Sequence, residues 1–319
     1  MKILLRHRRS PGDILMLTAA VRDLKRAHPY LEVNVDTTVP SLWQNNPLLS
    51  REVSTENADR VIDIEYPLIN RSDELPYHFI HAFRKELQLQ LGVSIPQGSF
   101  RPDVYLSDDE KLPHPLLSEV GPYWLIDAGY KKDFTLKNWG LSRYQEVVDI
   151  LGDTVRFVQI GENNPDHVHR KLRGVCDYVG RTGIRDLMRL MYHASGVLTP
   201  VSFPMHLSAA LPLPDGGIRP CVVIAGAREP AHWEQYPGHV YFQNVGMFDC
   251  CHDKSCWRSR AVALNDGSDC DNSLCLRPFC GDDGETVGSC MAAVEPAVVA
   301  SAIFQFQRFR HKTETMSLD

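Results

Sequence analysis

The strongest constraint on the fold is an alternation of short apolar segments with longer amphipathic ones, which begins at the first residues. Residues 2–5 (KILL) are apolar enough for a strand buried on both faces, and 13–27 carry apolar side chains at helical spacing. The segments 31–35 and 61–64 are expected as two further strands, and 78–91 as a helix. Strands that alternate with helices favour a parallel sheet with right-handed crossovers.

The same alternation restarts after a segment rich in proline and acidic residues at 96–115, which we interpret as a link between two domains. Strands are expected at 123–128, 156–160, 196–199 and 221–225, and helices at 141–151, 184–193 and from 205 onward. Ser142 is the expected N-cap of the first of these helices.

We therefore predict an α/β protein with two Rossmann-like domains that face a cleft, comprising residues 1–112 and 113–319. The second domain contains an irregular cysteine-rich insert at 250–290 and ends in a helix at 295–309, which can cross back to brace the first domain. In open α/β sheets, ligands bind at the carboxyl ends of the strands, so the loop after the first strand points at the expected site.

Composition narrows the functional classes. The chain of 319 residues has a net charge of −6, which provides no overall attraction to nucleic acid or anionic lipid. No transmembrane segment is expected, because no stretch approaches the roughly 20 apolar residues that span a bilayer. Basic residues at 6–9 follow the apolar start, where a signal peptide would have to continue its apolar core. We therefore expect a cytoplasmic protein.

The turn at residues 10–13 (SPGD) is the first candidate for chemistry. Gly12 lets the backbone approach a ligand closely, and Asp13 stands at the start of a helix. Two interpretations of Asp13 remain open, because a carboxylate at that position is a good helix cap but can also serve as a general base for an acceptor hydroxyl.

Two later segments could bind phosphate. Lys137, in the sequence KNW, lies in a loop before a helix and could neutralise a diphosphate leaving group, although a loop lysine is more often only solvated. In the segment 199–210 (TPVSFPMHLSAA), a strand runs into a tight turn and a helix N-terminus, whose amides can cradle phosphate. His206 is expected in the first turn of that helix.

The order of these motifs resembles glycosyltransferase family nine, the ADP-heptose:lipopolysaccharide heptosyltransferases and their relatives. The resemblance covers nearly the whole chain, through GDILMLTAAVRDLKRAHP, KNWGLSRYQEVVDIL, VQIGE and PMHLSAAL. It implies the two-Rossmann B-type glycosyltransferase fold and transfer of heptose or a related hexose from a nucleoside-diphosphate donor to a hydroxyl acceptor, with inversion and no catalytic metal.

The resemblance also implies roles for individual residues. Asp13 matches the catalytic base and Gly12 the glycine beside it, while Lys137 matches the lysine that contacts the diphosphate. Glu162 falls near the acid that meets the nucleoside, through ribose hydroxyls. The loop that wraps the diphosphate contains Ser202, Met205 and His206.

One departure concerns the donor site. The family carries Asp-Ser/Thr-Gly before Pro-Met-His, whereas this chain has Val201-Ser202-Phe203. A carboxylate and a flexible glycine are therefore missing beside the donor, which leaves the sugar open.

A second departure is the insert, where seven of the nine cysteines lie within 250–290 in polar sequence. A cysteine-bearing branch that looks similar holds a metal there. Four thiolates suffice for tetrahedral zinc or iron, so we expect a structural metal, with free thiols as the alternative because no CxxC pair is present. The best-spaced ligands are Cys251 (or Cys250), Cys256, Cys275 and Cys290, which leaves Cys270 and Cys280 spare.

The acceptor is not defined by the sequence. His78, His81 and Arg84 line the expected acceptor side, and they suit a glycan, a lipid-linked sugar or a protein equally. A nucleotide-sugar or carbohydrate binder without activity is the alternative function, favoured by the Val201 triplet. A sugar transferase that modifies nucleic acid is least favoured, although Trp257, Arg258 and Arg260 would suit such contacts.

Overall fold

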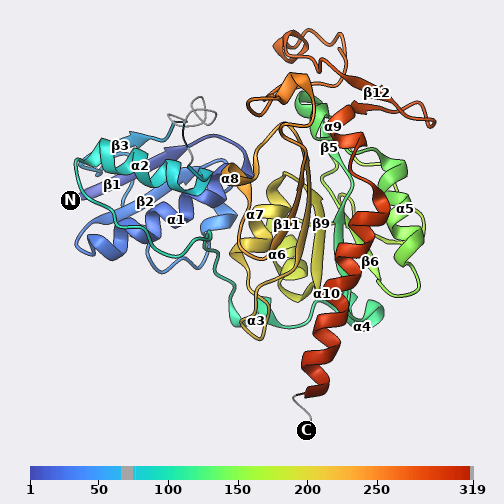
Figure 1. The fold of residues 1–319 in the computed structure, drawn as a ribbon. Helices are drawn as coiled ribbons and strands as arrows, with labels where there is room; N and C mark the ends of the chain where they lie inside the picture. The colour runs from blue at the N-terminus through green and yellow to red at the C-terminus, as the bar shows by residue number, and fades with distance from the viewer. Residues whose placement is uncertain (66–74, 76, 317–319) are drawn as a thin grey trace.

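The computed structural model describes residues 1–65, 75 and 77–316 (Figure 1). The first parallel sheet has the order β2-β1-β3 and consists of β1 (Lys2–His7), β2 (Glu32–Thr37) and β3 (Arg60–Asp63). Helices α1 (Pro11–Ala27) and α2 (Phe79–Leu91) pack against each other and share a core with the sheet. The strands and helices predicted for the first half are confirmed.

The boundaries of α1 follow from local chemistry. Pro11 occupies the first turn, where its missing N–H costs nothing, and Asp13 places a carboxylate at the positive end of the helix dipole. Lys25 and Arg26 lie in the last turn, at the negative end. This helix begins directly after β1, so the carboxyl end of the sheet and the helix N-terminus lie together.

The second parallel sheet has the order β11-β10-β9-β4-β6-β8. Its strands are β4 (Trp124–Asp127), β6 (Phe157–Ile160), β8 (Cys176–Asp177), β9 (Gly196–Pro200), β10 (Cys221–Gly226) and β11 (His239–Gln243). The four predicted strands are confirmed, and β8 and β11 are added at the two edges.

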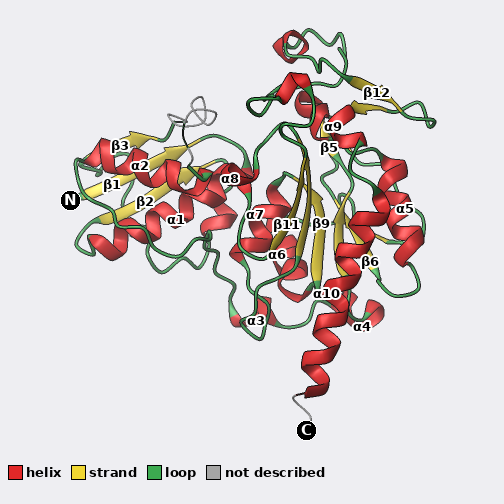
Figure 2. Cartoon of the chain, viewed as in Figure 1, coloured by secondary structure: helices red, strands yellow, loops and turns green. Residues whose placement is uncertain are grey.

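Helices cover both faces of this sheet (Figure 2). On one face, α6 (Ile184–His193) and α7 (Phe203–Ala210) share a core with the first domain, and α7 contacts α1. On the other face, α5 (Leu141–Leu151) and α10 (Pro296–Met316) enclose a second core. The α/β fold with two Rossmann-like halves is therefore confirmed.

The final helix packs differently from the expectation that it braces the first domain. Val299, Ala300 and Ile303 of α10 are buried in the core that contains Tyr144 and Val147 of α5. In Figure 1 the helix runs beside α5, on the side of the second sheet remote from α1 and α2. The apolar stripe of α10 thus fits the second sheet, and the helix braces that domain.

The N-cap of α5 is a second correction. Gly140, with φ of 101°, precedes the helix in place of the predicted Ser142. The backbone N–H of Leu141 donates to Oε2 of Glu285, 2.8 Å away, and Asn138 donates to Oε1 of the same carboxylate. A carboxylate from the cysteine-rich insert therefore caps the helix, which a local sequence pattern does not reveal.

The remaining elements are short. They comprise α3 (Asp108–Lys111), α4 (Pro115–Val120), α8 (Ala231–Glu234), α9 (Ser289–Ala292), the 3-10 helices η1 (Pro40–Trp43), η3 (Lys132–Lys137), η4 (Asp249–Cys251) and η5 (Asp269–Asn272), and the antiparallel pairs β5 (Tyr130–Lys131) with β7 (His167–Val168) and β12 (Pro278–Cys280) with β13 (Thr286–Gly288). The predicted boundary at 112 falls between α3 and α4. Among the helices of the described residues, none has both the length and the apolar composition needed to cross a bilayer.

Candidate functional site

The turn after β1 meets the start of α7 where the two sheets adjoin. A Cβ atom on Gly12 would lie 3.0 Å from Cδ2 of His206 and 4.0 Å from Cα of Phe203. Any larger residue at position 12 would therefore have to displace the imidazole ring. Two sequence-predicted site residues, Gly12 and His206, are thus brought together from different domains.

Asp13 caps its own helix. The backbone N–H and the hydroxyl of Ser10 both donate to Oδ2 of Asp13, at 3.1 and 2.7 Å. The Asp13 side chain is 9% exposed, so its carboxylate lies just beneath the surface of the interdomain junction. The capping interpretation is confirmed, and these hydrogen bonds also hold the carboxylate in one orientation.

His206 belongs to a buried polar group. Its Nδ1 lies 3.0 Å from the hydroxyl of Tyr236, and its Nε2 lies 3.5 Å from Oε2 of Glu234. Burial, followed by the nearby His78 and Lys137, lowers the pKa of His206 well below its usual value. Burial and the neighbouring Glu229 raise the pKa of Glu234 well above its usual value. Burial therefore favours the uncharged forms of both His206 and Glu234.

Lys137 has a carboxylate partner. Its Nζ lies 2.9 Å from Oε1 of Glu229 and donates to the carbonyl oxygen of Val201 at 3.2 Å. Arg228 also contacts Oε1 of Glu229. Burial alone would raise the pKa of Glu229, but the Lys137 and Arg228 cations lower it overall, so this carboxylate is charged at neutral pH.

Ser202 precedes α7, but its hydroxyl does not cap that helix. The hydroxyl donates to Oδ2 of Asp127 at 3.0 Å and lies 2.9 Å from the Thr199 hydroxyl. Asp127 ends β4 and Thr199 lies in the adjacent β9, so all three side chains meet at the carboxyl edge of the second sheet. Met205, one turn into α7, is fully buried in the core, which leaves its backbone as the part nearest the loop.

Glu162 follows β6 at the same edge, and its backbone N–H donates to Nε2 of His169 at 3.3 Å. The His169 ring fills a recess over Gly129 and Gly161, because a Cβ atom on either glycine would overlap it. Its Nδ1 lies 3.9 Å from Oδ1 of Asp127. Burial lowers the pKa of His169 and raises that of Asp127.

The three predicted acceptor-side residues lie along the start of α2. His78 is the N-cap of α2 and packs between the rings of Phe100 and Tyr236, where burial lowers its pKa to about 3. The His81 ring lies 5.3 Å from that of Phe100. Arg84 donates to the carbonyl oxygen of Ile95 at 2.7 Å. His78 and Phe100 line an open groove of about 400 Å³ beside α8.

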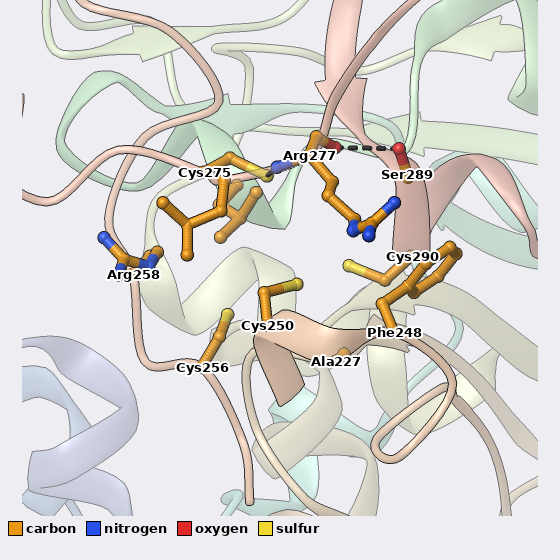
Figure 3. A pocket seen from close by; sticks show the side chains of 11 residues that line it. Ala227, Phe248, Cys250, Cys256, Arg258, Cys275, Arg277, Ser289 and Cys290 are labelled. Carbon is orange, nitrogen blue, oxygen red and sulfur yellow. Dashed lines mark hydrogen bonds between the residues drawn. The ribbon is translucent and has the colours of Figure 1, made fainter. Parts of the chain in front are cut away.

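Four cysteines of the insert line one small pocket. They are Cys250, Cys256, Cys275 and Cys290, and Figure 3 shows their sulfur atoms directed into the same space. Burial raises the pKa of the Cys290 thiol to about 12 and also raises the pKa values of the other three thiols. In the described part of the chain, no three His, Cys, Asp or Glu side chains are close enough together to hold a metal ion as they stand.

At one position of the predicted ligand set, Cys250 rather than Cys251 lines the pocket. The Cys251 thiol lies in the core and donates to the carbonyl oxygen of Asn244 at 3.6 Å. Cys250 lines the pocket instead, because neighbouring residues of the η4 turn point in different directions. This is the alternative that the sequence left open. Cys280 is exposed on β12, and neither it nor Cys270 lines the pocket.

The insert is organised around a buried arginine. Arg260 is fully buried and forms ion pairs with Asp266 and Asp271 at 2.8 and 2.6 Å. Arg258 donates to the carbonyl oxygen of Leu274 at 3.0 Å. Both arginines therefore have partners inside the insert, which weakens the case for nucleic-acid contacts.

Four residues of the site were missed by sequence reasoning: Asp127, His169, Glu229 and Glu234. Asp127 was detectable, because it is a carboxylate at the carboxyl end of a predicted strand. Glu229 follows β10, His169 follows the two-residue strand β7 and Glu234 ends α8, and their partners are remote in sequence, so no local spacing indicates them.

Comparison with known proteins adds independent evidence. The family model for glycosyltransferase family 9 (heptosyltransferase) matches residues 50–237, which is more than half of the chain. No curated protein is significantly similar in sequence.

Three solved structures are similar in fold. The family 9 glycosyl transferase from Veillonella parvula DSM 2008 has a TM-score of 0.63 and 13% identity, covering 96% of each chain. ADP-heptose lps heptosyltransferase II from E. coli has a TM-score of 0.59 and 14% identity, and the match covers 98% of this chain and 100% of the other. The third is the dodecameric iron-containing heptosyltransferase TibC from enterotoxigenic E. coli H10407, in complex with ADP-D-beta-D-heptose. It has a TM-score of 0.66 and 17% identity, and the match covers 96% of this chain and 76% of the other.

Proposed function

This chain belongs to glycosyltransferase family 9 and is therefore a glycosyltransferase, and we propose that it moves a sugar from a nucleoside-diphosphate donor to a hydroxyl acceptor with inversion. The observation that carries the proposal is the junction at which Gly12 of the first domain touches His206 of the second. Asp13 is the neighbour of Gly12, and the charge of Lys137, which contacts Val201 and Glu229, acts on His206.

In the proposed reaction, the Asp13 carboxylate accepts the proton of the acceptor hydroxyl. The acceptor oxygen then forms a bond to the anomeric carbon from the face opposite the donor's diphosphate. The bond between that carbon and the phosphate oxygen breaks, and the leaving nucleoside diphosphate keeps the electron pair. Lys137 stabilises the developing negative charge on the diphosphate. The two hydrogen bonds from Ser10 support this role, because they fix the base before the acceptor arrives.

For the donor, we propose a nucleoside-diphosphate heptose or a related hexose, in line with the ADP-D-beta-D-heptose held by TibC. Gly12, Ser202 and the backbone of Met205 would surround the diphosphate, and Glu162 would meet the ribose. Because His206 is uncharged, its contribution would be hydrogen bonding rather than charge.

For the acceptor, we propose the side of the first domain that carries His78, His81 and Arg84. A glycan, a lipid-linked sugar or a protein would approach from this side. The open groove beside α8, which His78 and Phe100 line, supports an acceptor on this side, although His81 and Arg84 do not line it.

We also propose one structural zinc or iron ion in the insert, held by Cys250, Cys256, Cys275 and Cys290. Four soft sulfur donors that line one space support this proposal, as does the iron of the comparable TibC, and the thiols would have to move closer together to ligate the ion. A metal at this site would stabilise polar sequence that buries little apolar area. The insert packs on η3, where the N–H of Leu136 donates to the carbonyl oxygen of Ser259, so it also supports the segment that carries Lys137.

Two observations favour a second function. Lys137 is already neutralised by Glu229, and no carboxylate stands at position 201, which would suit a binder of nucleotide sugars without transferase activity.

The substitution Asp13→Asn tests the proposed mechanism. An asparagine oxygen can still accept both hydrogen bonds from Ser10, so the fold and the donor affinity should persist. Removal of a general base should lower kcat by about 10²- to 10⁴-fold. Ser10→Ala is the matched control: it removes one of these hydrogen bonds but keeps the carboxylate, so it should cost far less. Equal rates for Asp13→Asn and the parent would reduce Asp13 to a helix cap.

A further inference from the structure

Glu229 combines deep burial, charge and an oxygen without a partner. It follows β10 and is 4% exposed, and its Oε1 contacts both Lys137 and Arg228. Its other oxygen, Oε2, is buried and accepts no hydrogen bond from any described residue. A buried carboxylate oxygen that stays unpaired is costly, so such an atom commonly marks a place where a ligand or water completes the site.

Glu229 supplies the carboxylate that contacts Lys137. Lys137 bridges Oε1 of Glu229 and the backbone carbonyl of Val201, so the ammonium group touches both segments. The side chain of Val201 is buried and offers no hydrogen-bonding group. The carboxylate within reach of this ammonium therefore comes from residue 229.

Arg228 keeps the Glu229 carboxylate in place and charged. The Arg228 guanidinium lies 4.7 Å from the ring centre of Phe134 and 5.6 Å from that of Trp257, and its Nε donates to the carbonyl oxygen of Arg258. This cation is fixed from three sides, whereas the Lys137 side chain is 26% exposed and can turn toward a ligand. Glu229 therefore keeps one counter-ion when Lys137 changes partner.

We propose that Glu229 determines donor-sugar specificity, by accepting a hydrogen bond at Oε2 from a hydroxyl of the transferred sugar. A carboxylate repels phosphate oxygens and accepts hydrogen bonds only from donors, so the diphosphate itself cannot be its ligand. The sugar is attached to the diphosphate that Lys137 binds, and its hydroxyls are the nearest donors. This inference rests on the proposed function, because it requires Lys137 at the diphosphate.

The test compares two affinities in one variant. Calorimetry measures the Kd of ADP-heptose and of ADP for the parent and for Glu229→Gln, and UDP-glucose with UDP serves as a second pair. Loss of a hydrogen bond to a charged acceptor should raise the ratio of the nucleotide-sugar Kd to the diphosphate Kd at least about tenfold. The affinity for the diphosphate alone should stay the same or increase, because a negative charge has been removed beside it.

The adjacent buried acid provides the control. Glu234→Gln makes the same change from an acid to an amide in the same junction, but the Glu234 carboxylate contacts neither Lys137 nor Arg228 in the described contacts, so the ratio should change far less than in Glu229→Gln. The unfolding midpoint of each variant, measured with no nucleotide present, shows whether the fold is kept.

Three other outcomes would overturn either the role of Glu229 or the proposed function. An unchanged ratio in Glu229→Gln, or an equal loss for sugar and diphosphate, would overturn the role of Glu229 at the sugar while leaving the proposed function in place. The same rise in Glu234→Gln would trace the effect to general disturbance of the junction and would also overturn it. A parent protein that binds none of these four ligands, and no GDP-hexose or GDP when these are added to the test, would instead reject the proposed function itself.

Discussion

The pairing of Lys137 with Glu229 leads to a prediction about stability that does not depend on any substrate. Lys137→Met removes the ammonium group but keeps a flexible apolar stem beside the Phe134 ring, over which the Lys137 Nζ lies at 5.8 Å. Glu229, whose side chain is 6% exposed, would then be a buried carboxylate with Arg228 as its remaining charged contact. The variant should be less stable than the parent at neutral pH.

The magnitude follows from burial. Removing one partner of a fully buried ion pair costs about 3–5 kcal/mol, because the other charge is left uncompensated. The Lys137 side chain is 26% exposed and Arg228 stays in place, so we expect the smaller loss of about 2 kcal/mol. In the Glu229→Gln background no carboxylate is left uncompensated, and the same Lys137→Met change should cost only a few tenths of a kcal/mol.

The pH dependence gives this prediction its sign. The pKa of Glu229 is lowered in the folded protein, so its contribution to stability is present above the unfolded pKa and is lost as pH falls through the folded value. The difference between the parent and Lys137→Met should therefore shrink below about pH 4, near the pKa of an unfolded glutamate.

Urea unfolding of the four proteins of this double-mutant cycle, at pH 7 and at about pH 3, measures the effect. A penalty for Lys137→Met that is equal in the parent and in the Glu229→Gln background, or equal at both pH values, would refute the reasoning that a charged Glu229 is held by Lys137.

Two further predictions concern the insert and the carboxyl edge of the second sheet. Protein purified without added metal should contain about one zinc or iron per chain in elemental analysis. Cys250→Ser should lose this metal, and Cys251→Ser should keep it. The reverse pattern would make Cys251 the ligand instead of Cys250. Gly129→Ala should lower the unfolding temperature, because its Cβ would overlap the His169 ring, and the added substitution His169→Ala should recover much of the loss; no recovery in a thermal melt would contradict this packing.

Much of the fold could be predicted because the buried face of each helix or strand appears in the sequence as a periodic pattern of apolar residues. The helix Ile184–His193 agrees with its predicted range, and β10 extends the predicted strand by one residue. The edge strand β11 was missed, because half-exposed residues weaken the apolar pattern. The N-cap of α5 was wrong because Glu285, which accepts the helix N–H, is remote in sequence.

The site was predictable only in part, for a related reason. Gly12 and His206 were identified because both follow strands, and the ends of parallel strands meet at one edge. Glu229 and His169 act through partners brought close by the fold, so their chemistry has no signature in spacing. In the insert, spacing left Cys250 and Cys251 equivalent, and the direction of each thiol decides between them.

We propose that this chain binds a nucleotide sugar at the junction of its two domains. Thermal unfolding with a panel of nucleotide sugars is the most direct measurement of this binding. The panel includes ADP-heptose, related ADP-, UDP- and GDP-hexoses, the matching diphosphates and the free sugars. A donor present at a hundred times its Kd stabilises the folded protein by about 2.7 kcal/mol. We expect a clear rise in Tm with at least one nucleotide sugar, a smaller rise with its diphosphate and none with the free sugar. The same Tm with every nucleotide sugar as with buffer would contradict it.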